Sequence, residues 1–333
     1  MENSTEVLSF VLSAYGNIGE IKYLYFSMIL LWYLSICVNN AAVIMVIFMD
    51  KKLHEPMYIL LCNLLANEIF ATTLVYPLMM SQMFLDTHEV TLPWCFLQMC
   101  CLSTSASIEF CSLAAMAYDR YVAICCPLHY NIIMNTRRVG TITVLVWMYP
   151  FINTMFSFSL IVHLKFCGNV IDKLFCDHHL VIIIKLACSV SALNKLSDLL
   201  YAFVTIVVPF SLILVSYMKI LAVCLNTSEE SRQKAVTTCT PQIVSLSGLF
   251  IGLIFYSTDF SSDADLMSDR VRSFFTLSLL IYQPMLTPIM YGFNLPKIKQ
   301  SLKRFLTTHI QTVPHSEENL SFHYGQKINV FQD

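Results

Sequence analysis

The sequence predicts an all-α membrane protein, a bundle of seven transmembrane helices. Hydrophobic residues make up 56% of the 333 residues and charged residues only 13%, about half the charged share of a typical soluble domain. Mean hydropathy is +0.64. Seven apolar runs are each long enough to cross a bilayer, which takes about 20 helical residues. The composition therefore excludes a water-soluble protein of this size, and a net charge of −2 gives no reason to expect nucleic-acid binding.

The seven runs follow one another along the chain. The third is the least uniformly apolar, because Glu109 lies inside it and Asp119 and Arg120 lie near its end. The seventh contains Pro284 and Pro288, which a membrane helix tolerates where neighbouring helices satisfy its backbone. The predicted spans are residues 24–49, 57–84, 94–124, 139–162, 197–224, 237–259 and 273–293.

Lys and Arg residues near the span ends predict the orientation. One side of the bundle has eleven of them and the other has seven, four of which lie in the long segment 163–196 that the positive-inside rule discounts. We therefore expect residues 1–23 outside the cell, a membrane domain over 24–293, and a cytoplasmic segment over 294–333. Residues 1–20 lack the basic start and apolar core of a signal peptide. The outer segment contains Asn3, in Asn3-Ser4-Thr5, as a glycosylation acceptor.

An acid and a base are adjacent where the third span ends. The string from Met116 to Cys125 reads MAYDRYVAIC, with Asp119 and Arg120 at its centre. The pair could act as a two-state latch in which the carboxylate holds or frees the Arg. Alternatively, Arg120 simply extends its charge to the membrane interface.

This string, with Pro-Leu-His-Tyr at 127–130, resembles the signature of vertebrate olfactory receptors, which belong to the rhodopsin-like G-protein-coupled receptors. Further stretches resemble that family in the same order along nearly the whole chain. They are LHEPMY at 53–58, KAVTTC at 234–239, Ser216-Tyr217, and PMLTPIMY at 284–291. The Glu of LHEPMY is more similar to receptors of fish, and to their tetrapod relatives for water-borne odours.

Four positions depart from the family pattern. Asn39 precedes Asn40 where the family has Gly, and Glu68 stands where Asp is usual. Thr287 replaces the Asn of the seventh-span motif, and Gln242 follows Cys239 where His is common. The changes at Glu68 and Thr287 put the family's usual activation network in doubt.

Four cysteines lie in segments predicted to be outside, where disulfides form. They are Cys95, Cys167, Cys176 and Cys188, and the sequence alone allows three pairings. The resemblance implies Cys95–Cys176 and Cys167–Cys188. The neighbouring His178 and His179 could suggest a metal site, but a disulfide sulfur cannot act as a thiolate ligand, so we expect no metal or cofactor.

Glu68 and Glu109 are acids well inside the predicted spans. Burying a carboxylate there costs at least about 2.5 kcal/mol, so each must carry a proton, a cation or a hydrogen-bond partner. With Asn40, they could form one buried polar site that binds a proton or sodium. The alternative is two independently hydrogen-bonded, protonated acids.

The ligand site is expected between helices in the outer half of the bundle. Leu102 stands where aminergic receptors place an acid, which argues against a classical amine ligand. The Asp residues at 259, 263, 265 and 269 could attract cations or simply form a solvated loop. By resemblance, the pocket residues are Leu102, Ser103, Ala106, Ser107, Phe250, Leu253, Ile254, Leu277 and Leu280, a mostly apolar set.

The resemblance implies an odorant receptor that binds a small-molecule odorant, activates an olfactory-type stimulatory G-protein and raises cyclic AMP. The implied switch residues are Asp119, Arg120, Tyr121, Tyr217 and Tyr291. Basic and apolar residues alternate after the seventh span, which predicts a short amphipathic helix on membrane lipids. The sequence contains no metal-binding helix signature or nucleotide loop, so an enzyme is not expected. A receptor for a metabolite, lipid or peptide is the alternative, and a transporter or channel is less favoured because no inverted repeat is visible.

Overall fold

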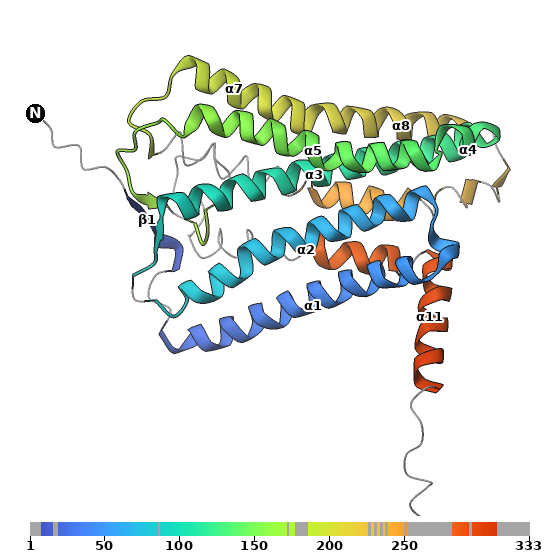
Figure 1. Ribbon diagram of the computed structural model, residues 1–333, viewed down its shortest axis with the longest axis horizontal. Coiled ribbons are helices and arrows are strands. Elements are labelled where there is room, and N and C mark those ends of the chain that lie inside the picture. Colours follow the sequence, from blue (N-terminus) through green and yellow to red (C-terminus); the bar gives the residue numbers. More distant parts are fainter. Residues whose placement is uncertain are drawn as a thin grey trace, which may run out of the picture.

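The computed structural model is a bundle of long helices that run back and forth along one axis (Figure 1). It describes residues 8–15, 19–85, 87–171, 173–176, 186–225, 228–229, 232–233, 236, 239–249, 251, 282–292 and 295–311. Within this part, five helical stretches are long and apolar enough to cross a membrane. They are α1 (Lys22–Met49), α2 (Pro56–Gln82), α3 (Leu92–Cys125), α5 (Thr136–Ile161), and the continuous stretch of α7 (Ala192–Ala202), the π-helical η5 (Phe203–Val207) and α8 (Val208–Leu225).

The first four predicted spans agree with α1, α2, α3 and α5 to within three residues at each end. The fifth begins at Ala192 and not at 197, so its predicted start was wrong. The Ser191 side chain accepts a hydrogen bond from Asn194 N (3.2 Å) and caps the helix there. For the sixth and seventh spans, 239–249, 251 and 282–292 are helical, and the remainder lies outside the described residues.

Short helices make the turns at one end of the bundle. After α1, the Asp50 side chain accepts a hydrogen bond from Lys52 N (3.0 Å) and caps η3 (Lys51–Leu53). Pro56 begins α2, where its missing N–H costs nothing. At the same end, η4 (Pro127–His129) and α4 (Tyr130–Ile133) connect α3 to α5.

A three-stranded sheet closes the opposite end of the bundle, although the sequence predicted only helices. Strand β1 (Ser9–Leu12) lies between β2 (Glu89–Thr91) and β3 (Val170–Ile171), in the order β2-β1-β3. It pairs antiparallel to β2 and parallel to β3. The helical turns η1 (Ser13–Tyr15) and η2 (Gly19–Ile21) then join β1 to α1. We call this the disulfide end.

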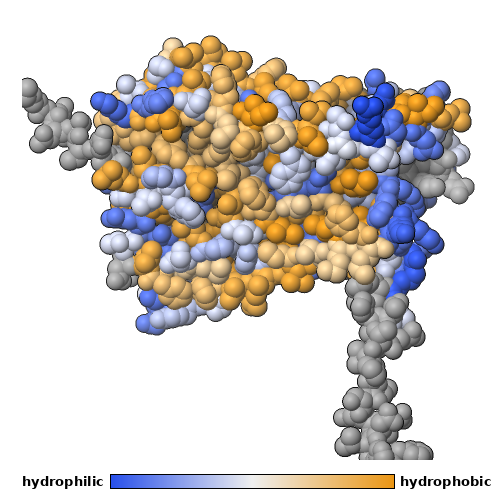
Figure 2. Space-filling model, viewed as in Figure 1, coloured by the Kyte–Doolittle hydropathy of each residue, from blue (hydrophilic) through white to orange (hydrophobic). Residues whose placement is uncertain are grey.

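The face of the bundle drawn in Figure 2 is largely apolar along its length, with polar side chains scattered among the apolar ones. Leu31 of α1 and Leu199 of α7 are 67% and 68% exposed, as expected for helices that face lipid rather than water. Inside, α3 packs against α2, α5 and α8. One buried apolar cluster lies towards each end of α3, around Met99 at the disulfide end and around Met116 at the other.

The opposite end, which we call the α11 end, has a separate helix, α11 (Pro296–Gln311), that runs away from the bundle axis (Figure 1). It is the position where the sequence predicts a short C-terminal helix. Ile298 is buried, and Lys297 forms an ion pair with Glu55, 2.5 Å between Nζ and Oε1. The Asp50 carboxylate accepts hydrogen bonds from Ser301 and from Arg304 (3.2 Å). These contacts attach one flank of α11 to the turn between α1 and α2.

Candidate functional site

Two disulfides constrain the segment after α5. Cys95 near the start of α3 is bonded to Cys176, and Cys167 is bonded to Cys188. This is the pairing that the resemblance implies. The first bond attaches the loop to α3, and the second closes a smaller loop within the same segment.

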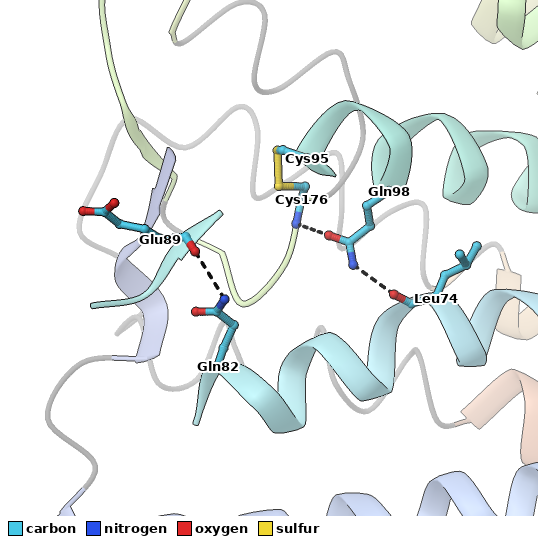
Figure 3. Close-up of a disulfide and its surroundings, with 6 residues drawn as sticks. All are labelled: Leu74, Gln82, Glu89, Cys95, Gln98 and Cys176. Atoms are coloured by element: carbon cyan, nitrogen blue, oxygen red, sulfur yellow. Dashed lines mark hydrogen bonds between the residues drawn. A yellow bond between two sulfur atoms is a disulfide. The ribbon is translucent and has the colours of Figure 1, made fainter. Parts of the chain in front are cut away.

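Gln98 links this loop to α2, one helical turn along α3 from Cys95. Its side-chain carbonyl accepts a hydrogen bond from Cys176 N (2.9 Å), and its amide donates to Leu74 O (3.2 Å), as Figure 3 shows. Gln98 is only 4% exposed. Gln82, at the end of α2, donates to Glu89 O of β2 (3.4 Å). The disulfide end is therefore held by buried polar contacts as well as by covalent bonds.

The N-terminal segment completes this closure. The Tyr15 hydroxyl donates to Leu174 O (2.6 Å), and the Tyr15 ring stacks on His88 at 4.9 Å. Burial raises the pKa of the Tyr15 hydroxyl above its ordinary range, so the hydroxyl stays protonated and continues to donate. Asn3 lies outside the described residues.

A polar cluster occupies the predicted ligand region between α3, α5 and α7. The Tyr201 hydroxyl donates to Ser103 O (3.2 Å) and lies 3.2 Å from both the Ser107 and the Thr154 hydroxyls. Tyr201 is 5% exposed. The structure thus brings two of the predicted pocket residues, Ser103 and Ser107, to one point.

The other predicted pocket positions do not join this cluster in the described part of the chain. Leu102 is half-buried and packs against the apolar cluster at the disulfide end, and Ala106 is exposed. The remaining five positions lie outside the described residues. They are Phe250, Leu253, Ile254, Leu277 and Leu280.

The sequence interpretation missed the buried face of α7. Asn194, Asp198 and Tyr201 are the buried residues of α7, and Thr205 of η5 continues the same face. Their spacing of four, three and four residues is a signal that the sequence contains. Three of these four residues lie within the span predicted from 197, but the sequence interpretation did not use their spacing. This buried face of α7 is polar, and it lies next to the serines of α3 that the sequence analysis expected in a mostly apolar ligand site.

A second polar group lies deeper in the bundle and includes all three predicted buried polar residues. Asn40, buried in α1, donates to Ile36 O and to Pro284 O (both 2.9 Å) and so joins α1 to the seventh segment. Glu68 is 2% exposed, and the Glu109 carboxyl lies close enough to repel it electrostatically.

The seventh segment supplies two further members that the sequence interpretation did not identify as a pair. Thr287 lies beside the Glu68 carboxyl, but its hydroxyl donates to Gln283 O (3.1 Å). The Gln283 side chain lies beside Glu109. Within the described residues, both Glu68 carboxyl oxygens and both polar atoms of the Gln283 side chain are buried without a hydrogen-bond partner. Buried polar atoms of this kind normally require water, a proton or an ion.

At the α11 end of α3, Asp119 and Arg120 are bonded to each other. The Asp119 carboxylate accepts a hydrogen bond from Arg120 Nε (3.0 Å) and another from the Tyr130 hydroxyl (2.8 Å). Asp119 is fully buried, whereas the Arg120 side chain is 15% exposed. Burial and the Asp119 charge raise the pKa of Tyr130, so its hydroxyl remains a donor. In the structure the Asp119 carboxylate therefore holds Arg120, which is the closed state of the latch that the sequence suggested.

The other predicted switch residues lie near this pair. Tyr217 of α8 donates to the Gln242 side chain (2.7 Å), and Tyr291 is fully buried in the same apolar cluster as Met116. Tyr121 packs against that cluster and is half-buried. Among the described residues, no group of three or more His, Cys, Asp or Glu could hold a metal ion.

Comparisons with known proteins agree with this architecture. A family model described as olfactory receptor matches residues 28–309. Human olfactory receptor 11A1 is 32% identical over 303 residues, covering 90% of this chain and 94% of the relative. Mouse olfactory receptor 5G9 is 32% identical, covering 91% and 96%, and human olfactory receptor 4M1 is 32% identical, covering 92% and 97%. The chain belongs to the olfactory receptor family: it is a multi-pass plasma-membrane receptor of the G-protein-coupled class, and not an enzyme.

Proposed function

We propose that the chain binds a small-molecule odorant at the polar cluster between α3, α5 and α7, activates a stimulatory G-protein of the olfactory type, and raises cyclic AMP. The observation that supports this most directly is the placement of two sites on one helix. Ser103 and Ser107 of α3 meet Tyr201 near the disulfide end, and Asp119 and Arg120 end the same helix at the other side. A change in how α3 packs at the first site can therefore alter the second.

The proposed orientation places the disulfide end outside the cell and the α11 end in the cytoplasm. Disulfides persist in the oxidising space outside the cell, and the α11 end has the larger share of Lys and Arg. Residues 1–23 are then extracellular with Asn3 glycosylated, 24–293 form the receptor domain, and 294–333 are cytoplasmic. The exposed flank of α11, with Lys299 and Lys303, faces lipid headgroups.

In the proposed switch, ligand binding favours a bundle conformation in which Arg120 leaves Asp119 and meets the G-protein. A ligand shifts such an equilibrium only by its difference in affinity for the two conformations. Breaking the Asp119 contacts requires Tyr130 to release the same carboxylate, because both donors share it. Tyr217 and Tyr291 then rearrange with the fifth and seventh spans, while Tyr121 keeps its packing beside Arg120.

The deeper polar group is proposed to hold a proton or a sodium ion between Glu68 and Glu109 and to favour the inactive conformation. The reason is that two close carboxyls and the buried Gln283 amide need a shared partner. Changing Glu68 and Glu109 to Gln removes the carboxyls that would hold the proton or sodium ion. The double change should therefore shift basal cyclic AMP. The exposed Glu89→Gln change is the matched control. Unchanged basal output together with unchanged sodium sensitivity would remove this part of the proposal.

The ligand contacts proposed from the family pattern are Leu102, Ser103, Ala106, Ser107, Phe250, Leu253, Ile254, Leu277 and Leu280. The proposed likeness to receptors for water-borne odours rests on Glu55 of LHEPMY, whereas the relatives reported above are human and mouse proteins. Both water-soluble and volatile odorants therefore belong in the test.

The test is a cyclic-AMP reporter assay in cells that express the chain with an olfactory-type G-protein. Surface expression is measured first, and Arg120→Ala is the coupling-deficient control. A response that is lost in Arg120→Ala is the expected result. The receptor is tested with a panel of water-soluble odorants and a panel of volatile odorants. If it reaches the surface, responds to neither panel and responds to a metabolite, lipid or peptide, that ligand class replaces the odorant assignment.

A further inference from the structure

Asn67 of α2 and Ser105 of α3 join the two helices by a reciprocal pair of hydrogen bonds, which we call the α2–α3 clamp. The Asn67 side-chain amide donates to Ser105 O (3.0 Å), and the Ser105 hydroxyl donates to the Asn67 side-chain carbonyl (2.9 Å). Asn67 is 1% exposed and Ser105 is 4% exposed. Because both ends of one amide are used, a slide or a rotation of either helix strains at least one of the two bonds.

The clamp lies beside the two acids of the deeper polar group. Glu68 directly follows Asn67 in α2, and Glu109 lies one helical turn after Ser105 on the same face of α3. Glu68 is buried, and the Glu109 carboxyl lies close enough to repel it electrostatically. The clamp therefore joins α2 to α3 at the level where each helix contributes its acid.

The directions of the two helices make the meeting of these acids depend on their register. The Cα–Cβ bonds of a helix tilt towards its N-terminus. Helix α2 begins at the α11 end and α3 begins at the disulfide end, so Glu68 and Glu109 tilt towards each other. A slide of either helix by one residue moves its acid by about 1.5 Å along the axis, which is about half the length of a hydrogen bond.

Neighbouring hydrogen bonds hold parts of this polar group without joining α2 to α3. The Thr72 hydroxyl donates to Glu68 O within α2 (2.8 Å), and the Thr287 hydroxyl donates to Gln283 O within the seventh segment (3.1 Å). A second contact between α2 and α3, from Gln98 to Leu74 O, lies two turns along α3 from Ser105. The clamp is thus the contact between these helices that lies next to the acids.

We propose that Asn67 and Ser105 are positioning residues for Glu68 and Glu109, and that the clamp sets the register in which the two carboxyls share one proton or one sodium ion. The inference rests on the proposed proton or sodium site and names the contact that assembles it. Neither clamp residue has to touch the shared proton or ion. Both act only through the acids, and this determines how their variants combine.

The test is a double-mutant cycle on basal cyclic AMP in the full-length receptor at equal surface expression. Asn67→Ala removes both clamp bonds, and Ser105→Ala removes one of them. Each change is made in the wild type and in the receptor that carries both Glu68→Gln and Glu109→Gln. Thr104→Val is the matched control, since Thr104 is buried next to Ser105 and its hydroxyl donates a 2.8 Å hydrogen bond within α3.

Asn67→Ala should shift basal cyclic AMP in the same direction as the double Gln change, by about threefold or more, because two buried hydrogen bonds are lost. Ser105→Ala should give a smaller shift, and Thr104→Val should stay at the wild-type level. In the double Gln receptor, Asn67→Ala should add less than about twofold, since the groups that it positions are gone. A merely structural role would shift the output by the same factor in both backgrounds.

Thermal stabilisation of the purified receptor by sodium chloride, compared with choline chloride at equal ionic strength, gives a second reading that needs no G-protein. If sodium stabilises the wild type, Asn67→Ala should raise the half-maximal sodium concentration by about threefold or more. If sodium does not stabilise the wild type, the shared partner is a proton and the cyclic-AMP cycle decides.

Two results would overturn the positioning role while retaining the acid site. One is an Asn67→Ala effect of equal size in both backgrounds, and the other is a wild-type response of Asn67→Ala while the double Gln change alters basal output. If the double Gln change alters neither reading, the proton or sodium site is itself refuted, and the positioning role is refuted with it.

Discussion

The Tyr217 hydroxyl donates a 2.7 Å hydrogen bond to the side-chain carbonyl of Gln242, and the Gln242 amide donates in turn to Leu113 O of α3. One side chain therefore joins the fifth span, the sixth segment and the third span. Gln242 is 2% exposed, and its bond to Leu113 O is buried. Movement of the sixth segment away from α3 would break both bonds, so we expect Gln242 to stabilise the closed arrangement at the α11 end.

Gln242→Leu is expected to raise basal cyclic AMP. It removes two buried hydrogen bonds while keeping the side-chain volume, and each is worth about 0.5–1.5 kcal/mol, so the closed conformation should lose roughly a tenfold preference or more. Basal reporter output at matched surface expression measures the effect. Ser247→Ala is the control, since Ser247 is exposed and bonds only within its own helix. Basal output that remains at the wild-type level would show that these bonds survive activation.

Tyr130→Phe should also raise basal signalling, by a different contact. The change deletes the hydrogen bond to the Asp119 carboxylate, and bonds to charged groups are worth about 1.5–3 kcal/mol. The pKa of Tyr130 is raised above its ordinary 10.0 by burial and by Asp119. The Tyr130 hydroxyl can donate to Asp119 only while it is protonated, so this hydrogen bond is present below the raised pKa and is lost only above it. The difference between mutant and wild type should be the same at pH 6 and pH 8. The exposed Tyr118→Phe serves as the control, and a mutant effect that varies between these pH values would contradict the assignment.

Gln98→Leu should destabilise the disulfide end without breaking the disulfide. Leu74 O and Cys176 N both lose their Gln98 partner, and each buried group left unsatisfied costs about 1–3 kcal/mol. The thermal midpoint of the purified receptor should fall by several degrees. Gln300→Leu, on the exposed surface of α11, should leave the midpoint unchanged. If both variants melt like the wild type, water has replaced Gln98 in the mutant.

Attachment of α11 should depend on the ionised Asp50 carboxylate. Hydrogen bonds from Ser301 and from Lys52 N lower the pKa of Asp50 below its ordinary 3.8. A lowered pKa means that the contact contributes fully above 3.8 and is lost as the pH falls through the lowered value. Between pH 5 and pH 8 the attachment should be constant, and Asp50→Asn should weaken it at neutral pH.

Spin labels introduced through non-canonical amino acids at Lys52 and Thr307, both exposed, report the distance between the α1–α2 turn and α11. Asp50→Asn should broaden and lengthen the distance distribution. Lys303→Gln is the control, because Lys303 is exposed and is not among the described hydrogen-bond partners of Asp50. A distribution that narrows or stays the same in Asp50→Asn would mean that packing of Ile298 alone attaches the helix.

The amino-acid sequence by itself determined the helical membrane class, the first four spans, and the identity of the motif around Asp119 and Arg120. These features follow from hydropathy and from adjacent residues, which are local properties of the chain. Each span is recognisable because a membrane helix must satisfy its own backbone, whatever its neighbours are. The spacing of Asn194, Asp198 and Tyr201 is equally local, but spacing alone does not show which side chains of other helices they meet.

Only the tertiary structure decided which polar side chains meet. Tyr201 contacts Ser103 across 98 residues of sequence, and Asn40 contacts Pro284 across 244. The pairing of β1 with β2 and β3 likewise joins the N-terminal segment to two distant loops. Such contacts depend on how each helix rotates and tilts against its neighbours. Because every span has apolar residues on all sides, its sequence alone does not say which face turns inward, and packing across the whole bundle settles that choice.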